Sequence, residues 1–290
     1  MMNKPRWALF LGVLCISIFP ILIRMQLSSG LISAFYRMAI ASVVLVPYAY
    51  FSGNLKFTHS RFIYPTLLCG VIFALDITVW NISIQNSSAT QATLLTNLSP
   101  VWVGIISFLF LKNKPKRTFW WGVLLALVGV VVFVGVDVFR TFSLDTAFLL
   151  GILSGFFYAL YILLSKKTLQ EVQVIPFITT SSLSSAIFLF FINLIAGESF
   201  WGFSAQGWAS LLVQGLVCQL FAWLLISYAT QFMKATRVSL TLLSQAVFAT
   251  FFEWLFLNQS ISLQNSIGGI LILIGITITF YEPKKSNALF

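Results

Sequence analysis

Charged residues are scarce in this chain, and their scarcity excludes a water-soluble fold. Only 8% of the 290 residues are charged, and Asp and Glu together contribute seven. A soluble domain carries about 25% charged residues, so this chain lacks the polar side chains that a water-facing surface needs. The 17 basic residues give a net charge of +10. In a soluble protein that charge would point to nucleic acid, but its distribution, described below, argues against such a partner.

Histidine and cysteine are also sparse, which excludes several kinds of chemistry. The single histidine, His59, lies in a polar loop, so neither an HExxH zinc motif nor a His-based catalytic triad is possible. Cys15, Cys69 and Cys218 lie in apolar segments and are odd in number, so we expect no disulfide framework and no metal site. The sequence also lacks a glycine-rich phosphate loop ending in Lys-Ser or Lys-Thr, so direct coupling to ATP is unsupported. We expect no cofactor.

Long apolar runs fill most of the chain. Hydrophobic residues make up 59% of it, and the mean hydropathy is +0.96. A helix needs ~20 apolar residues to cross the hydrocarbon of a bilayer, and ten runs approach that length: 7–24, 31–51, 62–83, 88–111, 118–136, 147–165, 174–196, 208–230, 236–257 and 264–281. The first run resembles a signal peptide, but no small-residue cleavage site follows it, so we expect it to be retained. The sequence predicts an all-α integral membrane protein embedded in lipid.

The basic residues alternate between the two sides of these ten spans. If the N-terminus is cytoplasmic, 14 of the 17 basic residues fall in cytoplasmic segments: Lys4, Arg6, Lys56, Arg61, Lys112, Lys114, Lys116, Arg117, Lys166, Lys167, Lys234, Arg237, Lys284 and Lys285. Asp137, Asp145 and Glu198 fall in the opposite loops. The positive-inside rule therefore predicts cytoplasmic N- and C-termini, and nucleic acid is not an expected partner.

A weak internal repeat divides the chain. Residues Ala89 to Leu94 return 146 positions later as Ala235 to Leu240, and the same offset pairs Gln85 with Gln231, Gly122 with Gly268 and Gly129 with Gly275. With five spans in each half, 1–140 and 141–290, the second half must enter the membrane from the opposite side. Such inverted repeats are typical of secondary transporters. An alternative is that small residues recur because they let membrane helices pack closely.

Several motifs together resemble a known family. They are Phe35 to Ala39 in the second span, Ser99-Pro100-Val101 in the fourth, Gly122 to Gly129 in the fifth and Gly268 to Gly275 in the tenth. In this order they resemble the drug/metabolite transporter superfamily, specifically its EamA-like members, over nearly the whole chain. The resemblance implies ten helices in two inverted five-helix repeats, a place in the bacterial cytoplasmic (inner) membrane, and transport of amino acids or amino-acid-like compounds, most often by export. One departure is that Asn113 and Gln259 stand where the family often has an acid.

Asp76 is the most conspicuous polar residue within a span. An ionisable group at the bilayer centre costs ~2.5–3.5 kcal/mol or more, and usually faces the interior of the bundle. Trp80 lies one turn further along the same helical face, and the pair suits an ammonium or other cation. The alternative is that Asp76 pairs with Arg37 and holds two helices together. Arg37 belongs to the family's pattern, and we expect it to be structural.

The second half offers a comparable pair in the eighth span. Gln219 and Trp223 share a face and, at the 146-residue offset, lie near the position that matches Asp76. We expect them to bind the solute, unless Trp223 faces lipid and Gln219 bonds a neighbouring helix. Glu253 lies about a turn from the outer end of the ninth span, and three roles are open for it. It lines an outer cavity, it pairs with Arg24, or it snorkels to the headgroups.

Five further residues are candidate cavity liners or gating elements. Asn97 precedes Pro100, and the proline removes a backbone donor and kinks the fourth span. Gln245 lies at the matching place in the ninth span, and Tyr158 and Tyr161 are weaker candidates in the sixth. These predictions favour a secondary transporter that moves a small polar metabolite by alternating access, with a proton as a candidate coupled ion.

Other functions remain as alternatives. A carrier of larger organic cations, such as a drug or S-adenosylmethionine, would use the same carboxylates. An intramembrane enzyme would need Asp76 and Glu253 to face each other as an acid pair, and we do not expect an enzyme. A membrane scaffold without transport activity would leave the buried polar residues and the repeat unexplained.

Overall fold

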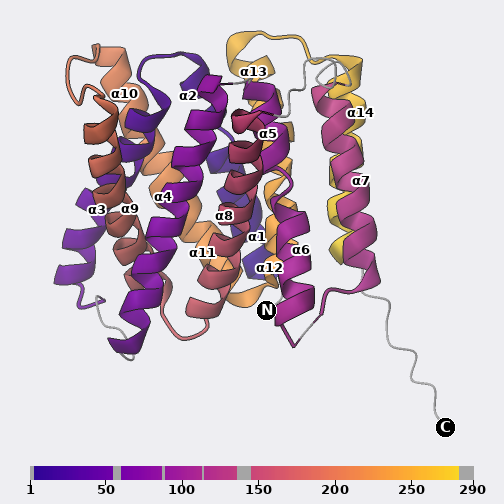
Figure 1. Cartoon of the computed structure of the whole chain (residues 1–290), viewed down its shortest axis with the longest axis horizontal. Coiled ribbons are helices and arrows are strands. Elements are labelled where there is room, and N and C mark those ends of the chain that lie inside the picture. The colour runs from indigo at the N-terminus through magenta and orange to yellow at the C-terminus, as the bar shows by residue number, and fades with distance from the viewer. Residues whose placement is uncertain (1–2, 55–59, 87–88, 113, 136–144, 281–290) are drawn as a thin grey trace.

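The chain folds into a bundle of membrane-length helices. The computed structural model describes residues 3–54, 60–86, 89–112, 114–135 and 145–280. Every element in these ranges is a helix, and nine helical segments are long and apolar enough to cross a membrane, with a shorter apolar helix at Leu94–Phe110. The helices stand side by side, and α1 begins and α14 ends at the same face, which is the lower face in Figure 1. The predicted all-helical membrane fold is confirmed.

The helices follow one another through short connections. The first part of the chain forms α1 (Asn3–Ile16), α2 (Phe19–Arg24), α3 (Gly30–Phe51), the 3₁₀ turn η1 (Ser60–Phe62), α4 (Ile63–Asn86), α5 (Ala89–Thr96), α6 (Ser99–Phe110) and α7 (Arg117–Val134). The second part forms α8 (Thr146–Thr168), α9 (Val174–Ala196), α10 (Ala205–Val213), the π-helix η3 (Gln214–Phe221), α11 (Ala222–Phe232), α12 (Ala235–Leu242), α13 (Ser244–Leu257) and α14 (Leu263–Phe280).

Local side chains set several of the helix ends. Ser29 accepts a hydrogen bond from the backbone N–H of Ile32 at the start of α3, and Asp145 does the same for Phe148 in α8. These are N-caps, which satisfy backbone donors that have no partner within the helix. At the other end of a helix, Gly197 closes α9 with φ +70°, a left-handed conformation that glycine adopts readily because it has no Cβ.

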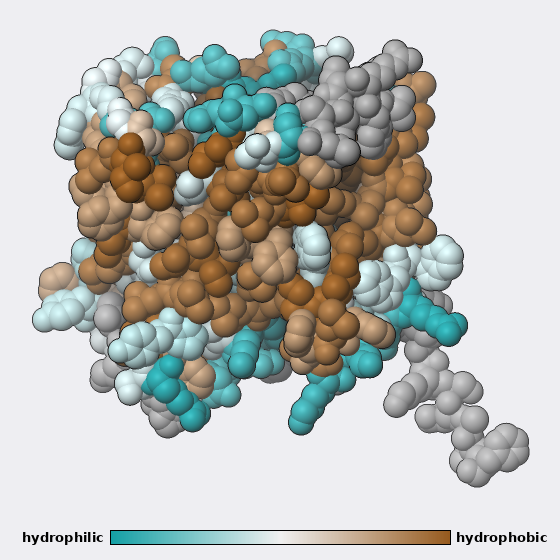
Figure 2. All heavy atoms as spheres, viewed as in Figure 1, coloured by the Kyte–Doolittle hydropathy of each residue, from teal (hydrophilic) through white to brown (hydrophobic). Residues whose placement is uncertain are grey.

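The outer surface of the bundle is apolar at mid-height. Figure 2 shows an apolar belt between hydrophilic groups at the upper and lower ends of this face. Large apolar side chains near the middle of the helices, such as Val43 of α3 and Ile187 of α9, are exposed, as expected for contact with lipid. Because lipid tails are as apolar as leucine, helices in a membrane associate through close packing of small residues and hydrogen bonds.

Glycines provide that close packing between α7 and α14. A Cβ atom on Gly122 would lie 2.6 Å from the carbonyl oxygen of Gly275, and one on Gly129 would lie 2.9 Å from that of Gly268. The backbones therefore touch at two points along the helix pair. These are the four glycines that the sequence offset of 146 picks out, and each pair joins one glycine from either half.

Three of the expected spans are broken into two helices each. The first breaks after Ile16, the fourth at Asn97 and the ninth at Leu243. Proline explains two of the breaks: Pro20 has no N–H to donate to the carbonyl of Ile16, and Pro100 has none for that of Thr96. The amide of Gln245 approaches the Ile16 carbonyl instead, at 3.5 Å. The eighth span holds a different irregularity, the π-helix η3, and such segments are frequent at functional sites.

Candidate functional site

Asp76 lies inside the bundle and is held by hydroxyl groups. Its side chain on α4 is 6% exposed. Ser154 of α8 donates a hydrogen bond to its Oδ1 at 2.6 Å, and Thr96 of α5 lies 2.9 Å from the Ser154 hydroxyl. Gly155 lets α8 approach α5, since a Cβ there would lie 3.0 Å from the carbonyl oxygen of Leu95. Three helices thus meet at one buried carboxylate, and the group that donates a hydrogen bond to it is a neutral hydroxyl.

Arg37 is the buried cation of the same region. It projects from α3 and is 5% exposed. Its guanidinium carbon lies 4.5 Å from the ring centre of Phe19 and 5.9 Å from that of Phe73, distances at which the charge is attracted to the ring faces. It is close enough to Asp76 for their charges to interact, but these two described side chains form no ion pair. The predicted alternative, a salt bridge that pins two helices, is therefore not seen.

Three aromatic rings pack beside Arg37. The ring of Phe73 stacks on that of Tyr161 at 4.6 Å, and Trp223 meets both rings edge-on at 4.9 and 5.3 Å. Trp223 is 3% exposed, so it does not face lipid. Among the described residues, neither the indole N–H of Trp223 nor the Nε of Arg37 has a hydrogen-bond partner. Two buried donors are therefore unsatisfied in the same neighbourhood.

Gln219 lies close to Phe73 and Tyr161, with which it lines the same gap. It comes from the π-helix η3 and is 3% exposed, and its Oε1 atom has no partner in the part of the chain that the structure describes. It lines a narrow gap between side chains that is too tight to admit a water molecule, together with Met38, Gly70, Phe73, Tyr161, Ile178, Ser181, Ser182 and Ser185. We call Arg37, Phe73, Asp76, Ser154, Tyr161, Gln219 and Trp223 the central cluster.

The remaining predicted residues lie outside this cluster or at its edge. Tyr158, on α8, is partly exposed and interacts electrostatically with Asp76 and Arg37. Trp80, on α4, is also partly exposed. Asn97 and Pro100 lie at the break between α5 and α6.

Glu253 lies at the upper end of the bundle, away from Asp76. Its carboxylate pairs with Arg24 at 2.9 Å, and Arg24 also donates to Gln259 at 2.9 Å. Arg24 closes α2 and Glu253 belongs to α13, so the pair links two helices at the upper face. Of the three roles predicted for Glu253, pairing with Arg24 is the one observed, and the acid pair that an intramembrane enzyme would need is not formed.

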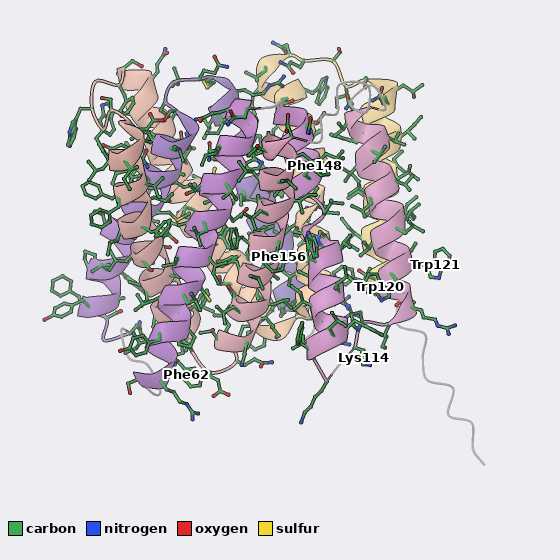
Figure 3. All side chains as sticks on the ribbon, viewed as in Figure 1. Phe62, Lys114, Trp120, Trp121, Phe148 and Phe156 are labelled. Atoms are coloured by element: carbon green, nitrogen blue, oxygen red, sulfur yellow. The ribbon has the colours of Figure 1, made fainter. Side chains whose placement is uncertain are left out.

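A larger cavity lies at the lower face. Its volume is about 750 Å³, and parts of α6, α7, α8, α11 and α12 surround it. Seven basic residues line it: Lys112, Lys114, Lys116, Lys166, Lys167, Lys234 and Arg237. Figure 3 labels Lys114 at the lower end of the bundle, near Trp120 and Trp121 at the start of α7. We call this cavity the basic vestibule. It shares no residue with the central cluster.

Sequence reasoning did not find Phe73 or Ser154 as site residues, and it gave Tyr161 only as a weaker candidate beside Tyr158. Phe73 is one of 30 phenylalanines, and no local pattern separates a ring beside a buried arginine from one that faces lipid. The serine-rich sequence of α9 is a further signal, which indicates hydrogen bonds between helices. Ser184 and Ser185 donate to the carbonyls of Leu67 and Gly70 at 2.9 and 2.7 Å, and a serine-rich stretch inside an apolar span predicts such contacts between helices.

Comparison with known proteins bears on what this geometry does. The model of the EamA-like transporter family matches residues 5–135 and 145–281. The chain is 25% identical to the uncharacterized transporter YdfC of Bacillus subtilis, covering 89% of this chain and 84% of that protein.

Two other relatives have named solutes. One is an S-adenosylmethionine uptake transporter of Rickettsia felis, 24% identical over 87% of this chain and 83% of its own. The other is the pseudopaline exporter CntI of Pseudomonas aeruginosa, 26% identical over 76% of this chain and 75% of its own. A solved structure superposes with a TM-score of 0.80 at 15% identity, over 95% of this chain and 96% of the other, which supports the fold alone.

Proposed function

The chain belongs to the EamA-like transporter family and is a multi-pass membrane transporter, and we propose that it carries a small zwitterion, an amino acid or amino-acid-like compound, by alternating access. The central cluster is the proposed binding site. The two relatives with named solutes work in opposite directions, one by uptake and one by export, so this family serves both directions. For this chain we propose export across the cytoplasmic membrane.

The observation that carries this proposal is the set of unsatisfied polar atoms in the central cluster. A buried polar atom without a partner costs about 1–3 kcal/mol, so such atoms persist where a ligand supplies the missing bonds. The donors of Arg37 and Trp223 fit a carboxylate, the Asp76 carboxylate fits an ammonium, and the Gln219 oxygen accepts a further N–H. Because Arg37 and Asp76 do not neutralise each other through an ion pair, both charges remain available to a zwitterion.

Two structural correspondences support an inverted repeat of residues 1–140 and 141–290. The break in the fourth span at Asn97 and the break in the ninth at Leu243 are 146 residues apart, which is the offset of the sequence repeat. The glycine contacts are reciprocal: moving Gly122–Gly275 by that offset in opposite directions yields Gly268–Gly129, the second contact. Such exchange of equivalent partners is what a twofold axis between two halves produces, and paired broken helices are typical of inverted-repeat transporters.

The two ends of the bundle differ in a way that suits alternating access. The basic vestibule is open at the lower face, whereas the Arg24–Glu253 pair joins helices at the upper face. By the positive-inside rule, the lysines of the vestibule support a cytoplasmic position for the lower face. We therefore interpret this conformation as open on the cytoplasmic side, with solute loading from the cytoplasm and Asp76 as the candidate carrier of a coupled proton.

A larger organic cation is the second candidate solute. Asp76 and the rings of Phe73, Tyr161 and Trp223 suit a cation, and the Rickettsia felis relative takes up S-adenosylmethionine. The positive charge of Arg37 beside the same rings disfavours a solute that is only cationic, which is why a zwitterion is preferred.

The test is solute counterflow in vesicles that contain the purified protein. Vesicles loaded with each unlabelled amino acid in turn are diluted into its radiolabelled form. Asp76→Asn removes the charge without changing the size of the side chain, and we expect it to reduce counterflow at least tenfold, since hydrogen bonds to charged groups are worth about 1.5–3 kcal/mol. The matched control is Asp145→Asn, where Asn caps a helix as well as Asp does.

The two variants separate the possible outcomes. Loss of counterflow in Asp76→Asn alone supports a substrate-binding carboxylate. Unchanged counterflow kinetics in that variant would assign Asp76 a structural role. Counterflow of lipophilic cations without any amino acid would favour the second candidate, and the absence of counterflow with every solute class would contradict the proposed function.

A further inference from the structure

The basic vestibule has a composition that the transport of a zwitterion through the central cluster does not explain. Seven cationic side chains surround one cavity, and none of the described residues that line it is acidic. The positive-inside rule accounts for lysines on this side of the membrane. It does not require them to converge from the end of α6, the end of α8 and the start of α12 onto a single hollow.

The floor of the vestibule is apolar. Ile72 of α4, Ile106 of α6 and Leu160 and Leu163 of α8 line it beneath the lysines. A charged rim above an apolar floor matches an amphiphile, whose charged group stays near water while its apolar body is buried. The volume of about 750 Å³ lies within the range of ~300–1,000 Å³ that is usual for small-molecule sites.

A buried, unsatisfied hydroxyl provides a second, independent sign of a ligand. Ser107 on α6 is 2% exposed and lines the vestibule, yet its Oγ has no hydrogen-bond partner among the described residues. Serine in a membrane helix ordinarily donates to the carbonyl four residues earlier, as Ser42 does to Met38 at 2.8 Å. A hydroxyl left unsatisfied in a cavity wall is able to donate to an anion in that cavity.

Two of the cations that line the vestibule already donate hydrogen bonds to backbone carbonyls of the protein. Lys166 donates to the carbonyl of Gln231 at 2.8 Å, and Arg237 donates to that of Thr279 at 3.1 Å. Lys114 lies 4.7 Å from the ring centre of Phe108, and Lys234 is exposed at the N-cap of α12. Lys114 lies in the connection between α6 and α7 and Lys234 in that between α11 and α12, so two separate segments of the chain each present a cation to the vestibule.

We infer that the basic vestibule binds an organic anion, with a phosphate or carboxylate group held by Lys114, Lys234 and Ser107 and an apolar body resting on the floor. The same chemistry is offered by a soluble amphiphilic anion and by the headgroup and upper chains of an anionic phospholipid. The site is separate from the central cluster, so the inference stands whatever solute the cluster carries.

The test uses phenyl phosphate as a probe of both features, measured by isothermal titration against the full-length protein in a non-ionic detergent. We expect phenyl phosphate to bind more tightly than inorganic phosphate or phenol, because it satisfies rim and floor together. The variant Lys114→Gln/Lys234→Gln should weaken binding about tenfold, at the upper end of what two exposed ion pairs contribute. Ser107→Ala should weaken it at least tenfold, as the loss of one hydrogen bond to a charged group does.

The matched control removes the same amount of charge from the same face. Lys4→Gln/Arg61→Gln changes two basic residues at the start of α1 and at η1, outside the vestibule, and should leave binding unchanged. Equal weakening by both double variants would overturn the inference, because it would indicate diffuse attraction to a basic surface. Failure of phenyl phosphate to bind at low ionic strength, where charge attraction is least screened, would overturn it as well.

Lipid nanodiscs then distinguish the two sources of the anion. If the site takes a lipid headgroup, phenyl phosphate binds in phosphatidylcholine nanodiscs and is displaced in phosphatidylglycerol nanodiscs, and the displacement disappears in Lys114→Gln/Lys234→Gln. If it takes a soluble anion, the affinity is the same in both nanodiscs.

Discussion

Replacement of Gln219 by methionine distinguishes a ligand-binding role from a structural one, because a binding role predicts higher protein stability together with weaker solute binding. Methionine has nearly the length of glutamine but carries no polar group, so Gln219→Met removes the unsatisfied Oε1 while it fills the same space. An unsatisfied buried acceptor costs about 1–3 kcal/mol. The solute-free protein should therefore become more stable, whereas the solute should lose a hydrogen bond.

The two effects have measurable sizes. A gain of about 1 kcal/mol raises the midpoint of thermal unfolding by about 2–4 °C in a chain of this size class. The loss of a hydrogen bond worth about 1–3 kcal/mol weakens solute binding by about 5- to 150-fold, since each 1.4 kcal/mol is a factor of ten. Thermal unfolding in detergent gives the first quantity, and titration with the solute identified by counterflow gives the second.

Gln214 offers a matched control within the same π-helix. It is 1% exposed, its Oε1 also has no partner in the described chain, and its Nε2 donates to Ser210 at 3.1 Å. It does not line the narrow gap at the central cluster. Gln214→Met should therefore alter stability and leave solute affinity unchanged. A loss of stability in Gln219→Met with unaltered affinity would refute the assignment of Gln219 to the binding site.

Two further predictions concern packing and gating. Gly122→Ala places a Cβ 2.6 Å from the carbonyl oxygen of Gly275 and should destabilise the α7–α14 pair by about 1–3 kcal/mol, as overpacking does. Thermal unfolding measures this loss of stability. The control is Gly269→Ala on α14, whose Cβ would meet nothing closer than 3.4 Å and which should have no such effect. Glu253→Gln removes the ion pair with Arg24 and should favour opening at the upper face. A Gln245→Cys reporter in a chain without its native cysteines should then react faster with a membrane-impermeant thiol reagent added from that side, and an unchanged rate would contradict a gating role.

Much of the fold follows from local properties of the sequence. The cost of placing a residue in lipid depends on that residue and its neighbours, so composition and run length predicted the all-helical membrane fold without knowledge of any contact. Proline acts locally too, which is why Pro100 indicated the break in the fourth span. The break at Leu243 has no proline beside it, and no local signal predicted it.

The sequence also identified polar residues that lipid does not tolerate. Asp76, Gln219 and Trp223 were selected because a buried charge or amide needs a polar environment, and the structure places all three in one cluster. Their partners followed from no sequence pattern. A salt bridge between Arg37 and Asp76 was open as an alternative, but the structure pairs Asp76 with Ser154 on another helix.

What the tertiary structure alone decided is which side chains meet. Contacts depend on the rotation of each helix about its axis and on its crossing angle with its neighbours. These bring Phe73, Tyr161 and Trp223 together. They also place Glu253 beside Arg24 at the upper face. The lysines of the basic vestibule come from three segments, of which the first and the last are more than a hundred residues apart in the sequence. Partition into lipid is a property of each residue and is readable along the chain, whereas contact between helices depends on the positions of all of them and exists only in the folded bundle.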